Sequence, residues 1–98
     1  MLKTIINTIN NRQEISFTYS GLNRVALPCA VGVSTKGNDV LRCYQTLGGH
    51  VNSVHTWDLC FVSKISNLTL TGQTFIKNPN GYKTGDKGMN KIYAQIAD

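Results

Sequence analysis

The chain has 98 residues, with ten lysines and arginines against five aspartates and glutamates. This length has room for one domain (1–98) and not two, and a hydrophobic share of 41% excludes disorder over the whole length. The net charge of +5 favours an anionic partner such as a nucleotide or a nucleic acid.

Three cysteines stand at positions 29, 43 and 60, an odd number with no C-x-x-C pair. This spacing argues against a disulfide framework or a metal site. Each cysteine lies in a hydrophobic run, where a free thiol behaves as a small hydrophobic group, and free thiols fit a reducing compartment. The sequence has neither the core of a signal peptide nor a run of about 20 hydrophobic residues. We therefore expect a cytoplasmic protein without a membrane partner.

The N-terminal residues predict a helix followed by a strand. Residues 1–12 carry hydrophobic side chains at helical spacing, on Leu2, Ile5, Ile6 and Ile9, which is typical of an amphipathic helix. In residues 13–21 the period changes to two, which indicates a strand with one hydrophobic face formed by Ile15, Phe17 and Tyr19.

Three further segments read as strands. Residues 24–33 alternate, and Pro28 within them predicts an edge strand or a bulge because proline lacks an N–H. Residues 38–49 follow a tight turn. Residues 56–72 are long enough for one bent strand or two.

The C-terminal part predicts a turn and a helix over residues 78–97. Asp86 is placed to cap a helix. The inner face of that helix would carry hydrophobic residues at helical spacing, Met89, Ile92, Tyr93 and Ile96.

These elements together predict a mainly β protein. Consecutive short strands with tight turns favour a small antiparallel barrel over residues 13–75, because closure removes exposed strand edges. We expect about five strands, flanked by an N-terminal and a C-terminal helix. A barrel this small leaves edges that favour self-association, so we also expect a homo-oligomer.

The order of the motifs resembles the WYL domain family. A helix precedes an "I-x-F-x-Y" strand, here "ISFTY"; a strand ending in proline follows, here "RVALP"; a later strand ends in "KI" at 64 and 65 and continues into "L-x-L-T". When Leu41 is aligned with the leucine that the family is named for, Asp39 and Val40 occupy the tryptophan and tyrosine positions. Trp57 or Tyr44 would then supply part of the aromatic lining.

The resemblance implies an Sm-like or Src-homology-3-like barrel that senses a ligand or binds nucleic acid, often within bacterial transcription regulators. In such regulators a helix-turn-helix precedes the domain, and this chain has no segment for one. The resemblance therefore implies a ligand-binding module without the part that reads DNA.

The candidate site begins on the strand at 38–49. Alternation places Leu41, Cys43 and Gln45 on one face, and the more polar Arg42 and Tyr44 on the other. Arginine offers a planar fork for phosphate, and tyrosine offers a ring for stacking a base. The alternative is a solvated arginine lying along a tyrosine ring, a common pair without function.

Other residues are expected around this strand. We assign ligand-binding roles to Arg42, Tyr44, Gln45, Trp57, Lys64, Tyr82, Lys83 and Lys87. The last three lie in "NGYKTGDK", where glycines let a ligand approach backbone N–H groups. Turn residues before a helix also need no function, so this segment has a purely structural interpretation as well.

The sequence does not predict an enzyme. Acidic residues are too sparse for paired acid–base chemistry, and neither histidine, His50 or His55, has ligands at metal-binding spacing. We expect a regulatory, non-enzymatic module without a cofactor, binding a nucleotide, a short oligonucleotide or single-stranded nucleic acid. The rivals are a protein-interaction subunit of a larger assembly, and a sponge for a signalling nucleotide such as a phage or mobile element encodes.

Overall fold

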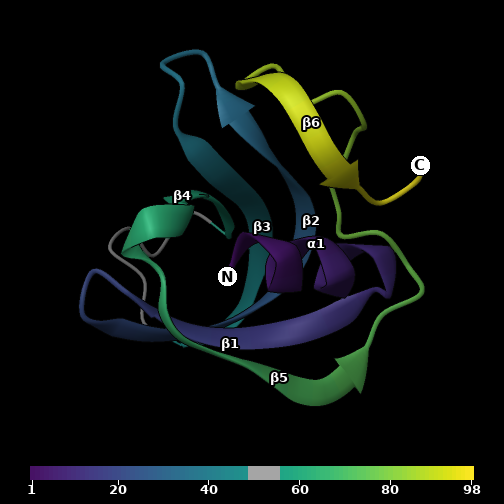
Figure 1. Ribbon diagram of the computed structural model, residues 1–98. Coiled ribbons are helices and arrows are strands. Elements are labelled where there is room, and N and C mark those ends of the chain that lie inside the picture. The colour runs from purple at the N-terminus through teal and green to yellow at the C-terminus, as the bar shows by residue number, and fades with distance from the viewer. Residues whose placement is uncertain (49–55) are drawn as a thin grey trace.

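The computed structural model describes residues 1–48 and 56–98, and it is mainly β with one N-terminal helix (Figure 1). His50 and His55, for which the sequence predicts no metal site, lie outside the described residues. The elements in chain order are α1 (Leu2–Asn10), β1 (Gln13–Tyr19), β2 (Leu22–Ser34), β3 (Asp39–Gly48), β4 (Trp57–Phe61), the short 3₁₀ helix η1 (Val62–Lys64), β5 (Ser66–Thr74) and β6 (Met89–Gln95).

The strands form one antiparallel sheet of six strands in the order β4-β3-β2-β1-β5, with β6 paired to β2. Residues 56–72, predicted as one bent strand or two, contribute to two strands, because η1 turns the chain between them and carries β5 to the far end of the sheet. The sheet is open rather than the predicted closed barrel, since β4 and β5 form its two ends and each pairs on one side among the described residues.

Strand β2 organises the sheet, because it contacts three other strands. It pairs with β3 along its length, with β1 through its first half, and with β6 through its second half. Pro28 pairs with Cys43 of β3, but on the other edge of β2 it lies between the last residue paired with β1, Ala26, and the first paired with β6, Ala30. On that edge no strand of the described residues pairs with the proline, which has no N–H to donate. The register shifts between Pro28 and Ala30, so the predicted bulge is confirmed.

The predicted C-terminal helix is wrong, since these residues form strand β6. Register shifts leave Asn90 and Tyr93 as extra residues opposite β2, and each extra residue changes the phase of the alternation. The helix-like spacing of Met89, Ile92 and Ile96 therefore arises from a bulged strand. Gly32 permits the pairing, because a Cβ there would collide with the backbone carbonyl oxygen of Lys91.

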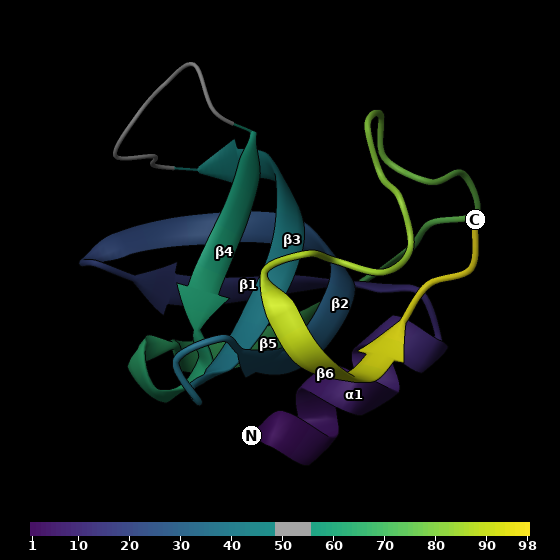
Figure 2. The same ribbon diagram turned by 90° about the horizontal axis from the view of Figure 1, so that it is seen from above.

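The hydrophobic core lies between α1 and the concave side of the sheet. Helix α1 contacts β1, β2 and β6, and it buries Ile5, Thr8 and Ile9 (Figures 1 and 2). Leu41 and Cys43 of β3 and Cys60 of β4 meet it from the sheet. All three cysteines are free and buried, as predicted.

Candidate ligand-binding site

The site is built on the outer face of the β3–β4 pair, opposite the core. Antiparallel pairing places Tyr44 beside Trp57, Arg42 beside Leu59, and Val40 beside Phe61. Side chains of directly opposite residues lie on one face of a sheet. The predicted alternation of β3 is confirmed here, because Leu41, Cys43 and Gln45 are buried while Arg42 and Tyr44 are half-buried on the other face.

Three aromatic rings gather at one end of this face. The rings of Tyr44 and Trp57 meet edge to face, with centroids 5.2 Å apart. The ring of Tyr82 stacks near Trp57, with centroids 6.3 Å apart and an interplanar angle of 26°. The indole N–H of Trp57 donates to the carbonyl oxygen of Asn80 at 3.0 Å, which fixes the ring. A fixed ring loses little entropy when a planar ligand stacks on it.

Tyr82 and its neighbours belong to the 78–88 segment, which crosses this face between β5 and β6 (Figure 2). The Tyr82 hydroxyl donates to the carbonyl oxygen of Ile96 at 2.6 Å, and burial raises the pKa of Tyr82 to about 12. Thr84 donates to the Asp98 carboxylate and the Gly85 N–H donates to the Gln95 side chain. The C-terminal residues therefore hold the 78–88 segment in place.

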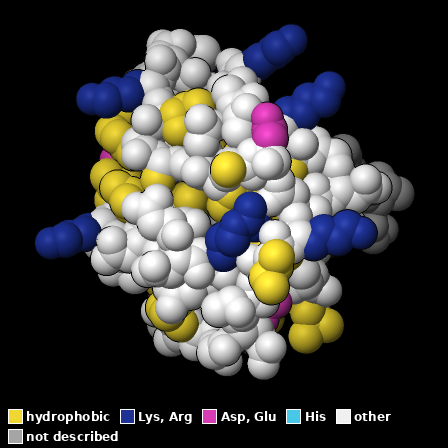
Figure 3. Space-filling view, turned by 90° about the vertical axis from the view of Figure 1, so that its right-hand side faces the viewer, with side chains coloured by type: hydrophobic (Ala, Val, Ile, Leu, Met, Phe, Trp, Pro, Cys, Tyr) yellow, Lys and Arg dark blue, Asp and Glu magenta, His cyan; other side chains and the backbone are white. Residues whose placement is uncertain are grey.

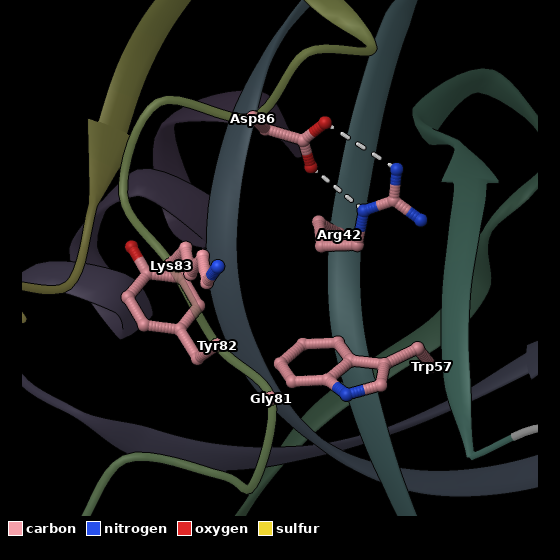
Figure 4. A pocket seen from close by; sticks show the side chains of 6 residues that line it. All are labelled: Arg42, Trp57, Gly81, Tyr82, Lys83 and Asp86. Atoms are coloured by element: carbon pink, nitrogen blue, oxygen red, sulfur yellow. Dashed lines mark hydrogen bonds and ion pairs between the residues drawn. The ribbon is translucent and has the colours of Figure 1, made fainter.

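A charged pair follows the rings along the same face. Arg42 donates from Nε to Asp86 Oδ2 at 2.7 Å and from Nη2 to Asp86 Oδ1 at 3.4 Å (Figure 4). The Gly88 N–H also donates to Asp86 Oδ1, at 2.8 Å. Burial by itself would raise the pKa of Asp86, but the guanidinium of Arg42 and the Gly88 N–H outweigh it and hold that pKa below its usual value.

Between the rings and the charged pair lies a depression of about 260 Å³, lined by Arg42, Trp57, Gly81, Tyr82, Lys83 and Asp86 (Figure 4). Gly81 has a φ of +89°, and a Cβ there would lie 3.4 Å from the indole nitrogen of Trp57. Glycine at 81 thus permits the close approach of the 78–88 segment to the indole. The lining combines flat rings with two cations and one carboxylate.

Of the eight residues assigned from the sequence, five come together: Arg42, Tyr44, Trp57, Tyr82 and Lys83. Gln45 lies on the core side of β3, with 8% of its surface exposed. Lys64 ends η1 and its Nζ lies over the Phe61 ring, 5.2 Å from the centroid. Lys87 is exposed and does not line the depression. These three residues are outside the site as the structure forms it.

Sequence reasoning missed the role of Asp86, which was assigned to cap a helix that does not form. It also missed Gly81 as a lining residue. The signal available for Asp86 was its place in the turn-rich segment with Tyr82 and Lys83. No pattern in the sequence links it to Arg42, 44 residues away.

Arg24 of β2 is a basic residue that lies outside the candidate site, and it is buried. Only 4% of its side chain is exposed, and its Nη1 lies 3.3 Å from Asp58 Oδ2. Its guanidinium carbon lies 5.2 Å from the centre of the Tyr19 ring. Arg24 thus belongs to the interior and not to the candidate site.

Within the described ranges, histidine, cysteine, aspartate and glutamate form no group of three or more that could hold a metal ion. Within the same part of the chain, no helix has the length and hydrophobicity to cross a membrane. Comparison of the chain with protein-family models, curated proteins and solved structures finds no match.

Proposed function

We propose that the protein is a non-enzymatic ligand-binding module for a nucleotide, a short oligonucleotide or single-stranded nucleic acid. The observation that carries the proposal is the depression in which the Trp57 and Tyr82 rings stand beside Arg42 and Lys83. A base stacks on an aromatic ring and the neighbouring phosphate attracts a cation, so this pairing of groups suits a nucleotide better than a neutral or acidic peptide.

The size and charge of the depression agree with this ligand class. About 260 Å³ lies just below the usual range for small-molecule sites, which suits one base with its phosphate at the mouth. Arg42 and Lys83 carry two positive charges, and Asp86 carries one negative charge. On the face in Figure 3, lysine and arginine side chains project in several directions and acidic ones are few. An anion is therefore favoured over a cation.

The hydrogen bonds to Asp86 determine which nitrogen atoms of Arg42 remain available to a phosphate. The Asp86 carboxylate occupies Nε and Nη2 of the guanidinium, while Nη1 has no partner among the residues that the structure describes. A phosphate thus binds through Nη1 and the Lys83 ammonium, or displaces Asp86. The carboxylate competes with the ligand, which limits affinity and makes it adjustable.

The expected location, regulatory role and oligomeric state are parts of the same proposal. The buried free thiols support a cytoplasmic location. The WYL-like motif order supports a regulatory sensor, and a lone sensor domain also suits a sponge for a signalling nucleotide. The edges of β4 and β5 that are unpaired among the described residues support a homo-oligomer, because pairing between copies of the chain would cover these edges.

A protein-interaction subunit is the second candidate function. It is favoured by exposed hydrophobic residues at the β5 end of the sheet, where Leu70 is 48% and Ile76 is 92% exposed. Salt dependence separates the two candidates. Binding through phosphate contacts weakens steeply between about 50 and 200 mM salt, whereas a hydrophobic protein interface changes little.

The test measures binding of thymidine monophosphate and of an octathymidylate by calorimetry and by Trp57 fluorescence, since Trp57 is the only tryptophan. Trp57→Ala should weaken binding by about 1–3 kcal/mol, the range for one stacked base. Arg42→Ala should weaken it by about 1.5–3 kcal/mol, and Arg42→Lys should recover part of the loss because lysine lacks the planar fork.

Two controls make this test specific. Leu70→Ala changes an exposed residue on the far end of the sheet and should bind as the wild type does. An Arg42→Ala/Asp86→Asn double variant removes the carboxylate left unpaired by the single change, so it separates lost attraction from new repulsion. Wild-type affinity in well-folded Trp57→Ala and Arg42→Ala proteins would end the case for this site.

A further inference from the structure

A second depression lies further along the outer face of the β3–β4 pair. It also measures about 260 Å³, and it contains Val40, Leu59, Phe61 and, from the turn between β2 and β3, Lys36. Val40 is buried and forms the hydrophobic base of this depression, while Leu59 and Phe61 are each 39% exposed. An exposed phenylalanine ring beside a cation repeats the chemistry of the first depression.

The two depressions are neighbours, separated by the Arg42–Asp86 pair. Gly88 lines the second depression, and a Cβ placed on it would lie 3.1 Å from Asp86 Oδ1 and 3.5 Å from Arg42 Nη2. Both of these side chains line the first depression. A ligand lying on this face would therefore pass from one depression to the other directly over the guanidinium of Arg42.

Strand geometry gives the distance between the two aromatic positions. Trp57 and Phe61 stand four residues apart on the same face of β4, and a strand rises about 3.3 Å per residue, so they are separated by about 13 Å. Stacked nucleotides advance about 3.4 Å each along one strand, so this span corresponds to about four steps, or about five nucleotides when both end bases are counted. One base cannot reach both rings.

Charge along this path suits a phosphate backbone. Lys36 lines the second depression, Lys64 holds its ammonium 5.2 Å from the centre of the Phe61 ring, and Arg42 stands between the two rings. The acidic groups nearby are engaged: Asp86 pairs with Arg42, and Asp39 accepts a hydrogen bond from the Tyr93 hydroxyl. Stacking rings with cations between them form a surface for single strands.

We infer that the second depression is a further base subsite, so that the ligand is single-stranded nucleic acid of about five nucleotides or more rather than a mononucleotide. One base stacks near Trp57, another near Phe61, and the phosphates between them lie along Arg42 and Lys64. This inference rests on the proposed function. It assigns a phosphate contact to Lys64, which does not line the first depression.

The experiment compares thymidine monophosphate with oligothymidylates of increasing length, on wild-type protein and on Phe61→Ala, Phe61→Tyr and Trp57→Ala variants. Wild-type affinity should rise until the strand has about five nucleotides and then level off. Phe61→Ala should weaken octathymidylate binding roughly 5- to 100-fold while leaving the monophosphate within about twofold. Phe61→Tyr keeps a ring and should restore most of the binding.

The experiment needs a control variant far from both depressions and a check that each variant is folded. Leu70→Ala is the matched hydrophobic control, and melting curves establish that each variant is folded. If Phe61→Ala binds octathymidylate as tightly as the wild type while Trp57→Ala does not, the second subsite is wrong and the proposed function stands. If neither probe binds the wild-type protein, both the second subsite and the proposed function are wrong.

Discussion

Two arginine–aspartate pairs differ in their surroundings, although their arginines lie on the paired strands β2 and β3. Arg24 and Asp58 are 3.3 Å apart, with 4% and 16% of their side chains exposed. Arg42 and Asp86 are 2.7 Å apart, with 29% and 12% exposed. Arg24 has the Tyr19 ring beside it and a buried Nε without a hydrogen-bond partner among the described residues, whereas Arg42 borders a depression open to solvent.

This difference shows that one residue type serves the fold in one place and a surface site in the other. Water cannot reach Arg24, so losing its partner would leave a charge buried and uncompensated. Arg42 is reached by water, so its pair contributes less to stability and can exchange its partner for a ligand. The contrast predicts opposite responses to mutation: unfolding for the inner pair and altered binding for the outer one.

The largest effect is expected at the inner pair. Arg24→Ala should lower the free energy of unfolding by about 3–5 kcal/mol, because it removes the buried cation that faces the partly buried Asp58 carboxylate. Urea unfolding followed by Trp57 fluorescence measures the change. Lys64→Ala, an exposed cation, is the control and should stay within about 0.5 kcal/mol. A similar small loss for Arg24→Ala would erase the distinction between the two pairs.

A smaller stability change, with a clear effect on binding, is expected at the outer pair. Asp86→Asn should cost about 1 kcal/mol of stability, since a partly exposed charged hydrogen bond is weakened and not abolished. It should also strengthen binding of octathymidylate, because it removes the carboxylate that competes for Arg42. Weaker binding by a folded Asp86→Asn protein would show that Asp86 positions Arg42 for the ligand instead of competing with it.

The outer pair also has a defined pH dependence. The pKa of Asp86 is below its usual value of 3.8, so the pair contributes fully to stability above about pH 4 and loses this contribution as the pH falls below that value. The difference in unfolding free energy between wild type and Asp86→Asn should therefore be constant near neutral pH and shrink in acid. A difference unchanged down to about pH 2 would contradict this assignment.

The smallest effect is expected at Tyr82, which anchors the 78–88 segment. Tyr82→Phe removes the hydrogen bond to the Ile96 carbonyl oxygen and should cost about 1 kcal/mol. Because the pKa of Tyr82 is raised from 10.0 to about 12, its contribution is present below pH 10 and is lost as the pH rises toward 12.

Ultraviolet titration of the phenols, compared between wild type and Tyr82→Phe, measures the pKa directly. Tyr93 is a useful comparison, because its hydrogen bond to Asp39 also raises its pKa although the ring lies at the surface. Ionisation of Tyr82 near its ordinary pKa would show that the 78–88 segment is not held against Ile96 in solution.

Local pattern was enough to predict several elements and part of the candidate site. The i, i+3, i+4 spacing in α1 and the alternation in β1 and β3 depend on neighbours in sequence, so helix and strands were predicted within a few residues. Arg42, Tyr44 and Trp57 were also predicted, because a polar or aromatic residue on a strand otherwise made of aliphatic ones stands out. The same alternation puts Leu47 on the face of Leu41 and Cys43, but Leu47 is 70% exposed, since the core ends before it.

The sequence by itself therefore determined a mainly β domain, an N-terminal helix, free buried thiols and a strand with a cation and a ring on its outer face. Only the tertiary structure decided the rest. Residues 89–95 became a strand because the second half of β2 offered an unpaired edge and Gly32 let it approach. The same pairing brought the 78–88 segment over β3 and joined Asp86 to Arg42. Contacts across 44 residues depend on how the whole sheet is assembled, and no local spacing records them.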